Sequence, residues 1–379
     1  MEILHICSDF AKQSIYNQLV THLSKSGIDQ KIYVPVRTKA EIDKNKNADL
    51  LNVEYQYSFI LNKIDRINYF GKISKTFKDL TTHFDVSKVG LVHAHFLFSD
   101  GGIAYELYKR HQIPYIVAVR NTDLNAFFKY FIHLRKHALA ILEHASQIIF
   151  LSEAYRIQLF DKYIPIHLKE SFEKKSKVIP NGINKYWFTN EYFRVPSEIK
   201  PQIILYVGDF TKNKNVQIII QAVNKLIKQG EKLKLQIVGG GGDYDVAIRK
   251  LASQHTDWIE LIDRVRDIEK LKLIYRNADI FVMPSKYETF GLVYIEAMTQ
   301  GMPVIYSKGQ GIDGYYPNGE IGYAVEAGNV NDLADKIQLI RADYLNISNN
   351  CSKATGKFSW IAISQQYIEL YNQKSRKIR

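Results

Sequence analysis

Residues 203–238 read IILYVGDFTKNKNVQIIIQAVNKLIKQGEKLKLQIV, and this stretch decides the fold class. Its short apolar runs at 203–207 and 234–238 are typical of buried strands, whereas 216–229 is amphipathic and predicts a helix. A strand followed by a helix and a second strand indicates a parallel sheet with helices on its faces.

The same alternation extends outward over most of the chain. Upstream it predicts strands at 2–7, 31–36, 90–94, 115–119 and 147–151, and helices at 15–23, 103–111 and 127–144. Downstream it predicts helices at 245–254 and 293–300, and strands at 280–283 and 303–306. A polar stretch at 174–200 interrupts the pattern. We therefore predict an α/β protein with two Rossmann-like, doubly wound parallel-sheet domains, 1–185 and 200–357. The active site is expected in the cleft between them.

Composition excludes several other classes of protein. Of the 379 residues, 46% are hydrophobic and 24% are charged, which excludes wholesale disorder. Cys7 and Cys351 lie at opposite ends of the chain, which excludes a secreted disulfide scaffold. The first residues show no signal-peptide pattern, and no apolar run approaches the ~20 residues that span a bilayer. We expect a cytoplasmic protein.

The net charge of +12 favours anionic partners. No zinc-finger spacing, RNA-binding aromatic signature or basic-heptad pattern accompanies it, so nucleic acid is not expected as a partner. A basic C-terminal cluster (Lys374, Arg376, Lys377 and Arg379) suggests peripheral contact with anionic lipid at the inner face of the cell membrane. The stretch 127–144, with aromatic and basic residues interleaved, fits either such a surface or an amphipathic core helix.

The segment 284–304, PSKYETFGLVYIEAMTQGMPV, carries the strongest chemical signal. Within it, Thr289-Phe290-Gly291-Leu292 leads directly into a predicted helix. Backbone N–H groups and the positive end of the helix dipole suit a phosphate at such a helix start. Glu288 precedes this loop and can reach what the phosphate carries, and Glu296, inside the helix, can accept hydrogen bonds from a sugar diol. A pair of glutamates alone is more simply explained as a helix cap and a solvated side chain.

As a whole, this segment resembles the E-x7-E region of retaining glycosyltransferases of family 4, which have the GT-B fold. The resemblance implies that Glu288 lies near the donor sugar, that Glu296 holds the nucleotide ribose and that the loop between them binds the diphosphate. It also implies a nucleotide-diphosphate sugar as donor, a glycan or lipid-linked hydroxyl as acceptor and a retained anomeric configuration. No cofactor and no metal are expected. The abundance of Lys, Ile, Asn and Tyr suggests an AT-rich bacterial genome, where such enzymes often build capsule, lipopolysaccharide or other surface glycans.

Residues 206–223, YVGDFTKNKNVQIIIQAV, resemble the strand–Gly–loop–Lys–helix element of the same family, with Gly208 as its glycine. Lys214 takes the position of the lysine that contacts the donor diphosphate. The residue after the glycine is usually arginine, but it is Asp209 here, and an aspartate cannot neutralise phosphate. Lys212, or Arg120 after the strand at 115–119, is the candidate for the missing cation, with a surface role as the alternative for each.

Weaker matches cover the rest of the second half. Gly239 begins a Gly-rich loop in 235–245, and Val265 lies in a stretch that resembles the loop near the nucleotide base. A simple turn and a core position, respectively, are the alternatives. Residues 178–188 resemble the family's Asn-Gly turn at the domain junction. Residues 360–371 resemble its closing helix, so 358–379 is expected to cross back to the N-terminal domain.

The N-terminal half matches less closely, as expected for a domain that faces a variable acceptor. Phe10, His95 and Asp123 are the candidate residues on the acceptor side, and Phe10 stands where the family often has a Gly-Gly loop. His93 and His95 point to one face of a strand and could bind a metal together, but no third ligand is evident nearby. A polar role in lining the cleft and a structural role are the alternatives.

Two other functions stay open. A GT-B nucleotide-sugar epimerase would need no acceptor, and a non-catalytic glycosyltransferase-like subunit would only bind a partner enzyme. Asp209 and the absent Gly-Gly loop are consistent with the second. We expect a glycosyltransferase in which Glu288, Lys214 and Arg120 carry the reaction.

Overall fold

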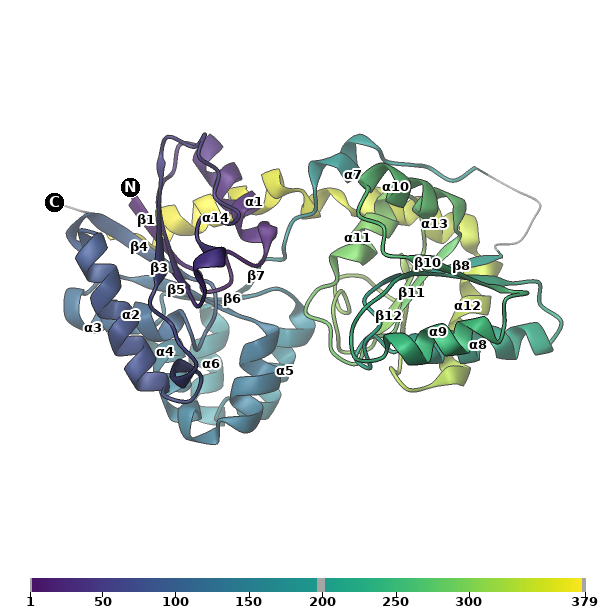
Figure 1. Ribbon diagram of the computed structural model, residues 1–379, viewed down its shortest axis with the longest axis horizontal. Coiled ribbons are helices and arrows are strands. Elements are labelled where there is room, and N and C mark those ends of the chain that lie inside the picture. The colour runs from purple at the N-terminus through teal and green to yellow at the C-terminus, as the bar shows by residue number, and fades with distance from the viewer. Residues whose placement is uncertain (1, 196–201, 377–379) are drawn as a thin grey trace. The chain divides into compact units, whose positions relative to one another are not determined.

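The computed structural model describes residues 2–195 and 202–376. Its contacts divide the chain into two compact units. Unit 1 comprises Met1–Leu151, Arg156–Asn181 and Trp360–Arg379, and unit 2 comprises Ser152–Tyr155 and Gly182–Ser359. The chain thus leaves unit 1, forms unit 2 and returns to unit 1 for its last helix (Figure 1). Of the basic C-terminal cluster, Lys377 and Arg379 lie outside the described residues.

Unit 1 is built on a seven-stranded parallel sheet in the order β3-β2-β1-β4-β5-β6-β7. The strands are β1 (Glu2–Ile6), β2 (Asp29–Val36), β3 (Val53–Phe59), β4 (Val89–Ala94), β5 (Tyr115–Val119), β6 (Gln147–Phe150) and β7 (Ser176–Val178). The α-helices are α1 (Ser14–Lys25), α2 (Tyr69–His83), α3 (Gly101–His111), α4 (Arg135–His144), α5 (Glu153–Tyr163), α6 (Ile166–Lys174) and α14 (Trp360–Lys374). Short 3-10 turns are at η1 (Lys39–Glu41), η2 (Ile64–Arg66), η3 (Val86–Lys88) and η5 (Ile132–Leu134), and η4 (Asp123–Phe128) is a π-helix.

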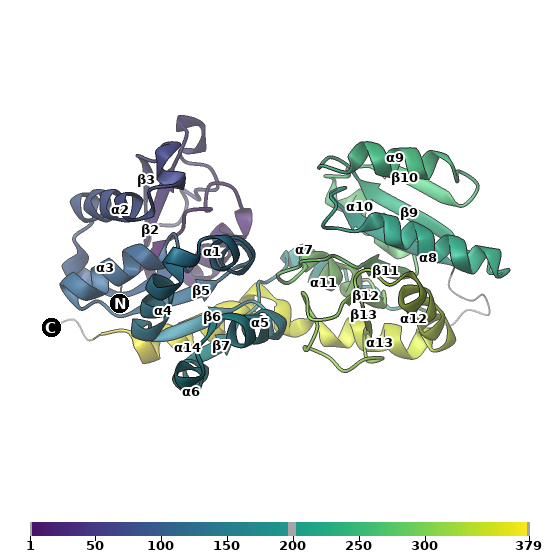
Figure 2. The same ribbon diagram turned by 90° about the horizontal axis from the view of Figure 1, so that it is seen from below.

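The central strands of unit 1 are apolar because helices cover both of their faces. Every residue of β4 and β5 is buried. Helix α1 buries Leu19 and Leu23 against the sheet, and α14 packs beside α1 with Ile363 in the same cluster. Figure 2 shows α14, in yellow, alongside the strands of unit 1. The last helix of the chain is therefore part of the core of unit 1.

Unit 2 is built on a six-stranded parallel sheet in the order β10-β9-β8-β11-β12-β13. The strands are β8 (Ile203–Gly208), β9 (Lys234–Gly239), β10 (Ile259–Asp263), β11 (Ile280–Met283), β12 (Val304–Ser307) and β13 (Gly322–Val325). The helices are α7 (Lys185–Thr189), α8 (Val216–Lys228), α9 (Asp245–Ser253), α10 (Ile268–Asn277), α11 (Leu292–Thr299), α12 (Val330–Ala342), α13 (Tyr344–Ala354) and the 3-10 turn η6 (Gly356–Phe358).

The predicted fold class is confirmed: both units are Rossmann-like α/β structures with parallel sheets. The prediction of one long helix over 127–144 is wrong, because the chain forms η4, η5 and α4 there. Aromatic and β-branched residues such as Phe127, Phe128 and Ile132 are weak helix formers, and Phe128 is buried against the ring of Tyr163. Tertiary packing therefore breaks the helix. No helix among the described residues is both long and apolar enough to span a bilayer.

Candidate active site

Two loops at the carboxyl end of the unit 2 sheet are fixed to each other. One loop follows β8 and the other follows β11, which is the neighbour of β8 in the sheet. The backbone N–H of Lys286 donates to the carbonyl oxygen of Asn213 at 2.8 Å. The Asn213 side chain also accepts from Tyr287 N at 3.0 Å and donates to Tyr287 O at 2.9 Å. Residues 74 positions apart are thereby held at the edge where ligands bind in such sheets.

Lys214 and Glu288, both predicted to be catalytic, form an ion pair on these two loops. Lys214 Nζ lies 2.6 Å from Glu288 Oε2 and 3.6 Å from Met283 Sδ. The two side chains are 24% and 14% exposed, so solvent screens the pair only partly. Asn215 is buried, is the N-cap residue of α8 and has a left-handed backbone conformation with φ 60°. Its side-chain amide donates to the carbonyl oxygen of Pro284 at 3.2 Å. The position of Lys214 is therefore set by a tightly bonded loop.

Helix α11 begins at Leu292, directly after the loop that Glu288 opens. Gly291 has φ 83°, and a Cβ atom there would lie 2.4 Å from the ring of Tyr294, so glycine is required. The backbone of Glu288 is held from outside the motif, because its N–H donates to Gln310 Oε1 at 3.1 Å and its carbonyl accepts from Gly311 N at 2.7 Å. Sequence reasoning missed these last two residues, which lie after β12.

The remaining donor-side residues of this loop differ in what they can offer a ligand. The side chain of Phe290 is buried between Tyr315 and Phe358, so its backbone, and not its ring, is what it can offer a ligand. Thr289 and Leu292 are half-buried. The helix dipole gives the start of α11 positive potential, and the Lys214 ammonium, paired with Glu288, lies on the neighbouring loop.

Asp209, the departure from the family pattern, is paired with an arginine. Arg264 Nη2 lies 2.5 Å from Asp209 Oδ1 and 2.6 Å from the carbonyl oxygen of Gly240. Arg264 directly precedes Val265, which is half-buried, and sequence reasoning did not identify this arginine. Lys212 is exposed, and its backbone N–H donates to Asp243 Oδ1 at 3.1 Å. The negative charge of Asp209 is therefore compensated within unit 2.

Two glycines allow the ends of β8 and β9 to approach each other. Gly208 and Gly239 are register partners, and a Cβ atom on Gly239 would lie 1.8 Å from the carbonyl oxygen of Gly208. Any side chain at Gly239 would separate the strands at this edge. Both predicted glycines thus lie at the strand ends that border the loops of Lys214 and Arg264.

Glu296 lies inside α11 and is partly buried. The hydroxyl of Tyr275 donates to Glu296 Oε2 at 3.4 Å. Burial raises the pKa of the Glu296 carboxyl to about 7, against the opposing effect of hydrogen bonds from Tyr275 and Trp187. Glu296 can therefore change its charge near neutral pH.

In unit 1, the predicted acceptor-side residues are buried. Asp123 accepts backbone N–H bonds from Leu97 at 3.1 Å, Phe98 at 3.1 Å and Arg120 at 2.8 Å, and burial raises its pKa to about 6. The guanidinium Nε of Arg120 donates to His95 O at 3.1 Å. Phe10 packs against aromatic rings of β3. Asp123 and Arg120 thus tie the loops after β4 and β5 together, whereas Phe10 lies after β1.

Three buried histidines meet in the unit 1 sheet, so a third imidazole does lie beside His93 and His95. His5 of β1 is the register partner of His93, and its Nδ1 lies 3.0 Å from His95 Nε2. Burial lowers the pKa of all three, which keeps the rings neutral. The rings of His93 and His95 stack with centroids 4.0 Å apart at 23°. One ring nitrogen of each histidine lies within 4.8 Å of the others, a spacing that a metal ion could use, and His93 Nδ1 lies 2.7 Å from the hydroxyl oxygen of Tyr371.

Comparison with known proteins defines the class of protein. Residues 189–358 match the family model of glycosyl transferases group 1. The matched region lies within unit 2, and the two parallel-sheet units match structures of GT-B glycosyltransferases. The matched region and the fold together support a glycosyltransferase of GT-B type.

Individual relatives agree with this class. The chain is 26% identical over 367 residues to the uncharacterized glycosyltransferase MJ1178 of Methanocaldococcus jannaschii, covering 93% of each chain. It is 30% identical over 177 residues to the capsular polysaccharide biosynthesis glycosyltransferase CapM of Staphylococcus aureus, covering 45% of this chain and 46% of that protein. Its structure resembles a sucrose-phosphate synthase from Thermosynechococcus elongatus with a TM-score of 0.77 and 23% identity, over 98% of both chains.

Proposed function

We propose that the protein is a retaining glycosyltransferase of family 4. It would move a sugar from a nucleotide-diphosphate sugar to a hydroxyl of a glycan or lipid-linked acceptor in bacterial surface-polysaccharide synthesis. The observation that carries the proposal is the Lys214–Glu288 pair at the start of α11. A cation, a carboxylate and the start of a helix without a side-chain cap lie on neighbouring loops, as the resemblance to family 4 implies.

The chemistry of this site suits departure of a diphosphate. The leaving group gains negative charge in the transition state, and preorganised donors at that point lower the barrier. The Lys214 ammonium and the first N–H groups of α11 would meet this charge, and Glu288 would lie beside the donor sugar. Glu296 would accept hydrogen bonds from the nucleotide ribose. The proposal assigns the charge to protein groups and requires no metal ligand.

In a single displacement, retention requires that the acceptor hydroxyl attack on the face from which the diphosphate leaves, whereas two successive displacements through a covalent intermediate also retain the configuration. In the proposed mechanism the leaving phosphate takes the proton of that hydroxyl, so no strong protein base is needed. We assign no catalytic contact to Arg120, because its guanidinium is buried against His95 O. Arg264 takes its place as a candidate second cation near the phosphates.

The acceptor class is proposed from a relative and from exposed side chains. The similarity to CapM, whose name assigns it to capsular polysaccharide biosynthesis, supports a surface glycan. Contact with the inner face of the cell membrane is proposed from Tyr130 and Ile132, which are 68% and 64% exposed beside Lys129. Flotation with anionic and neutral vesicles tests this contact: binding to the anionic vesicles is expected, and failure with both would contradict it.

The test of the function is acceptor dependence. The purified chain is incubated with a panel of nucleotide-diphosphate sugars, with and without glycan acceptors, and the products are identified by mass spectrometry. We expect nucleoside diphosphate release and a lengthened glycan when both substrates are present. Isomerisation of a donor without acceptor would instead identify an epimerase. Donor binding without turnover across the panel would identify a non-catalytic subunit.

A further inference from the structure

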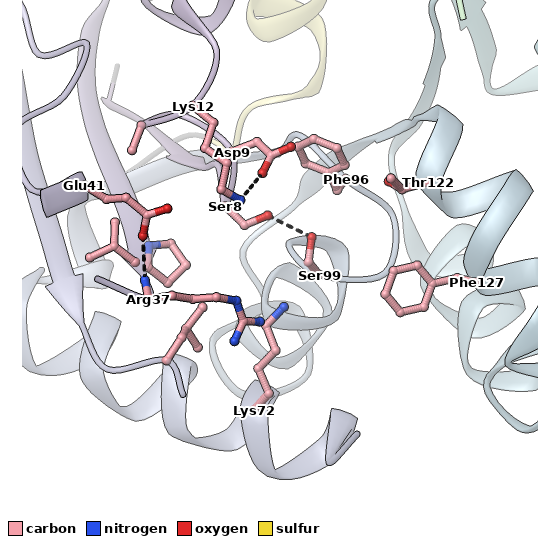
Figure 3. Close-up of a pocket in the computed structure, with 14 residues that line it drawn as sticks. Ser8, Asp9, Lys12, Arg37, Glu41, Lys72, Phe96, Ser99, Thr122 and Phe127 are labelled. Carbon is pink, nitrogen blue, oxygen red and sulfur yellow. Dashed lines mark hydrogen bonds and ion pairs between the residues drawn. The ribbon is translucent and has the colours of Figure 1, made fainter. Parts of the chain in front are cut away.

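A pocket of about 190 Å³ lies at the carboxyl edge of the unit 1 sheet, lined by residues that flank the acceptor-side candidates Phe10 and Asp123. Its walls come from β2, from the loops that follow β1 to β5, and from α2 (Figure 3). Carboxyl ends of parallel strands are where ligands bind in such sheets. The pocket is smaller than the roughly 300–1,000 Å³ of sites that enclose a whole drug-sized ligand. Its size therefore suits one polar group of a larger molecule.

Two cations converge in this pocket. Figure 3 shows the guanidinium of Arg37, after β2, and the ammonium of Lys72, on α2, pointing toward each other. Burial lowers the pKa of Lys72, and the nearby charge of Arg37 lowers it further, against the opposing effect of Asp100. Among the described residues, neither the Lys72 ammonium nor the Arg37 guanidinium has a carboxylate within ion-pair distance, although Arg37 Nη1 donates to the carbonyl oxygen of Asn62 at 2.5 Å. An anion between them would relieve this repulsion.

The acidic residues that line the pocket are occupied elsewhere. Glu41 Oε2 accepts from the backbone N–H groups of Arg37 at 2.9 Å and Thr38 at 3.1 Å. Asp9 Oδ1 lies 2.8 Å from Lys12 Nζ. Neither lining carboxylate pairs with the side chain of Arg37 or Lys72, and the carboxylates that act on Lys72, Asp100 and Asp65, do so from outside the lining.

Hydroxyl groups complete the lining opposite the two cations. Ser8 Oγ and Ser99 Oγ lie 3.0 Å apart, and both residues line the pocket (Figure 3). Burial raises the pKa of the Asp100 carboxyl to about 7, and both hydroxyls also hydrogen-bond this carboxyl, which lowers its pKa against the larger effect of burial. A hydroxyl both donates and accepts, so either can turn its proton toward an anion instead. Two cations and two hydroxyls provide more hydrogen-bond donors, in more directions, than a carboxylate with its two oxygens can accept. A phosphate, with three or four oxygens, matches them better.

We propose that this pocket binds a phosphate group carried by the acceptor, held by Arg37, Lys72 and the Ser8–Ser99 pair. That the phosphate belongs to an acceptor rests on the proposed function. The binding of phosphate in this pocket does not depend on that function. A soluble sugar phosphate and a phospholipid-linked sugar both present this group.

The test is the binding of inorganic phosphate to the full chain, by calorimetry at constant ionic strength. Lys72→Met and Arg37→Gln should each weaken binding about 10–150-fold, the range for one charged hydrogen bond. Lys78→Met is the matched control, because Lys78 is exposed on the same helix α2 and does not line the pocket. Lys214→Ala separates this pocket from the proposed donor site, and it should leave the pocket's phosphate binding unchanged.

The outcomes are distinct. Phosphate binding that survives Lys72→Met and Arg37→Gln but disappears in Lys214→Ala would overturn the inference and leave the proposed donor site intact. Absence of binding to the wild-type chain would also overturn it. Glucose 1-phosphate and vesicles of phosphatidic acid then distinguish the source of the phosphate. Binding that depends on Lys72 and occurs with the sugar phosphate alone indicates a soluble acceptor. Binding that depends on Lys72 and occurs with the vesicles indicates a lipid-linked acceptor. Lys72-independent binding to both would contradict the proposal.

Discussion

Replacing Lys214 with alanine should strongly impair sugar transfer. In the structure the Lys214 ammonium is 2.6 Å from Glu288 Oε2 and is 24% exposed, so it acts in a partly desolvated site. A charge-assisted hydrogen bond to phosphate is worth about 1.5–3 kcal/mol, or about 10–150-fold. The substitution also leaves the Glu288 carboxylate without its cation beside a polyanionic leaving group, which adds to the loss.

The assay is steady-state transfer with saturating acceptor and varied donor. Because the diphosphate gains charge as it leaves, kcat should fall together with kcat/KM. Lys214→Arg should recover part of the activity, although the guanidinium differs in reach and shape. Lys212→Ala is the control, because Lys212 is exposed two residues away, and it should cost at most about fivefold. A larger loss for Lys212→Ala than for Lys214→Ala would refute the reasoning and reassign the cation.

Three further predictions concern other buried or paired groups. Glu288→Gln should nearly abolish transfer at saturating donor while circular dichroism and the unfolding midpoint stay close to wild type. The Glu296 carboxyl, with its pKa raised to about 7 by burial, should ionise between pH 6 and 8, so the KM for the donor should fall several-fold over this range and stay flat in Glu296→Gln. Burial lowers the pKa of His5 to about 3, below the unfolded value near 6.5, so the unfolded chain binds the extra proton. His5 alone should therefore lower the free energy of unfolding by about 1.4 kcal/mol for each pH unit below 6.5. Urea titrations at pH 7 and 5.5 measure this effect, and His5→Gln should lose less free energy of unfolding between the two pH values than the wild-type chain.

The sequence predicted the core of the fold because its strands are short, apolar and separated by amphipathic helices. It also placed Lys214 and Glu288 on loops after strands of one parallel sheet. Strands β8 and β11 are neighbours, so the carboxyl ends of both meet at one edge. Two residues 74 positions apart thus become an ion pair. The break of the expected helix at 127–144 depended on packing around Phe128, which no local pattern reveals.

Other features depended on contacts between distant segments. Asp209 was considered alone in the sequence, whereas the structure pairs it with Arg264, which follows β10. His5 gave no signal as a single histidine in an apolar strand, and only the β1–β4 register brings it to His93. Arg37 and Lys72 lie on separate elements without any shared motif, so only the folded unit places them in one pocket.

The central claim is transfer with retention from a nucleotide-diphosphate sugar at the Lys214–Glu288 site. It is tested most directly by determining the anomeric configuration of the product by proton NMR during turnover of the wild-type chain, with Glu288→Gln as the inactive reference. The account predicts that the newly formed bond has the same anomeric configuration as the donor and that Glu288→Gln yields almost no product. A product of inverted configuration, or equal product from Glu288→Gln, would contradict it.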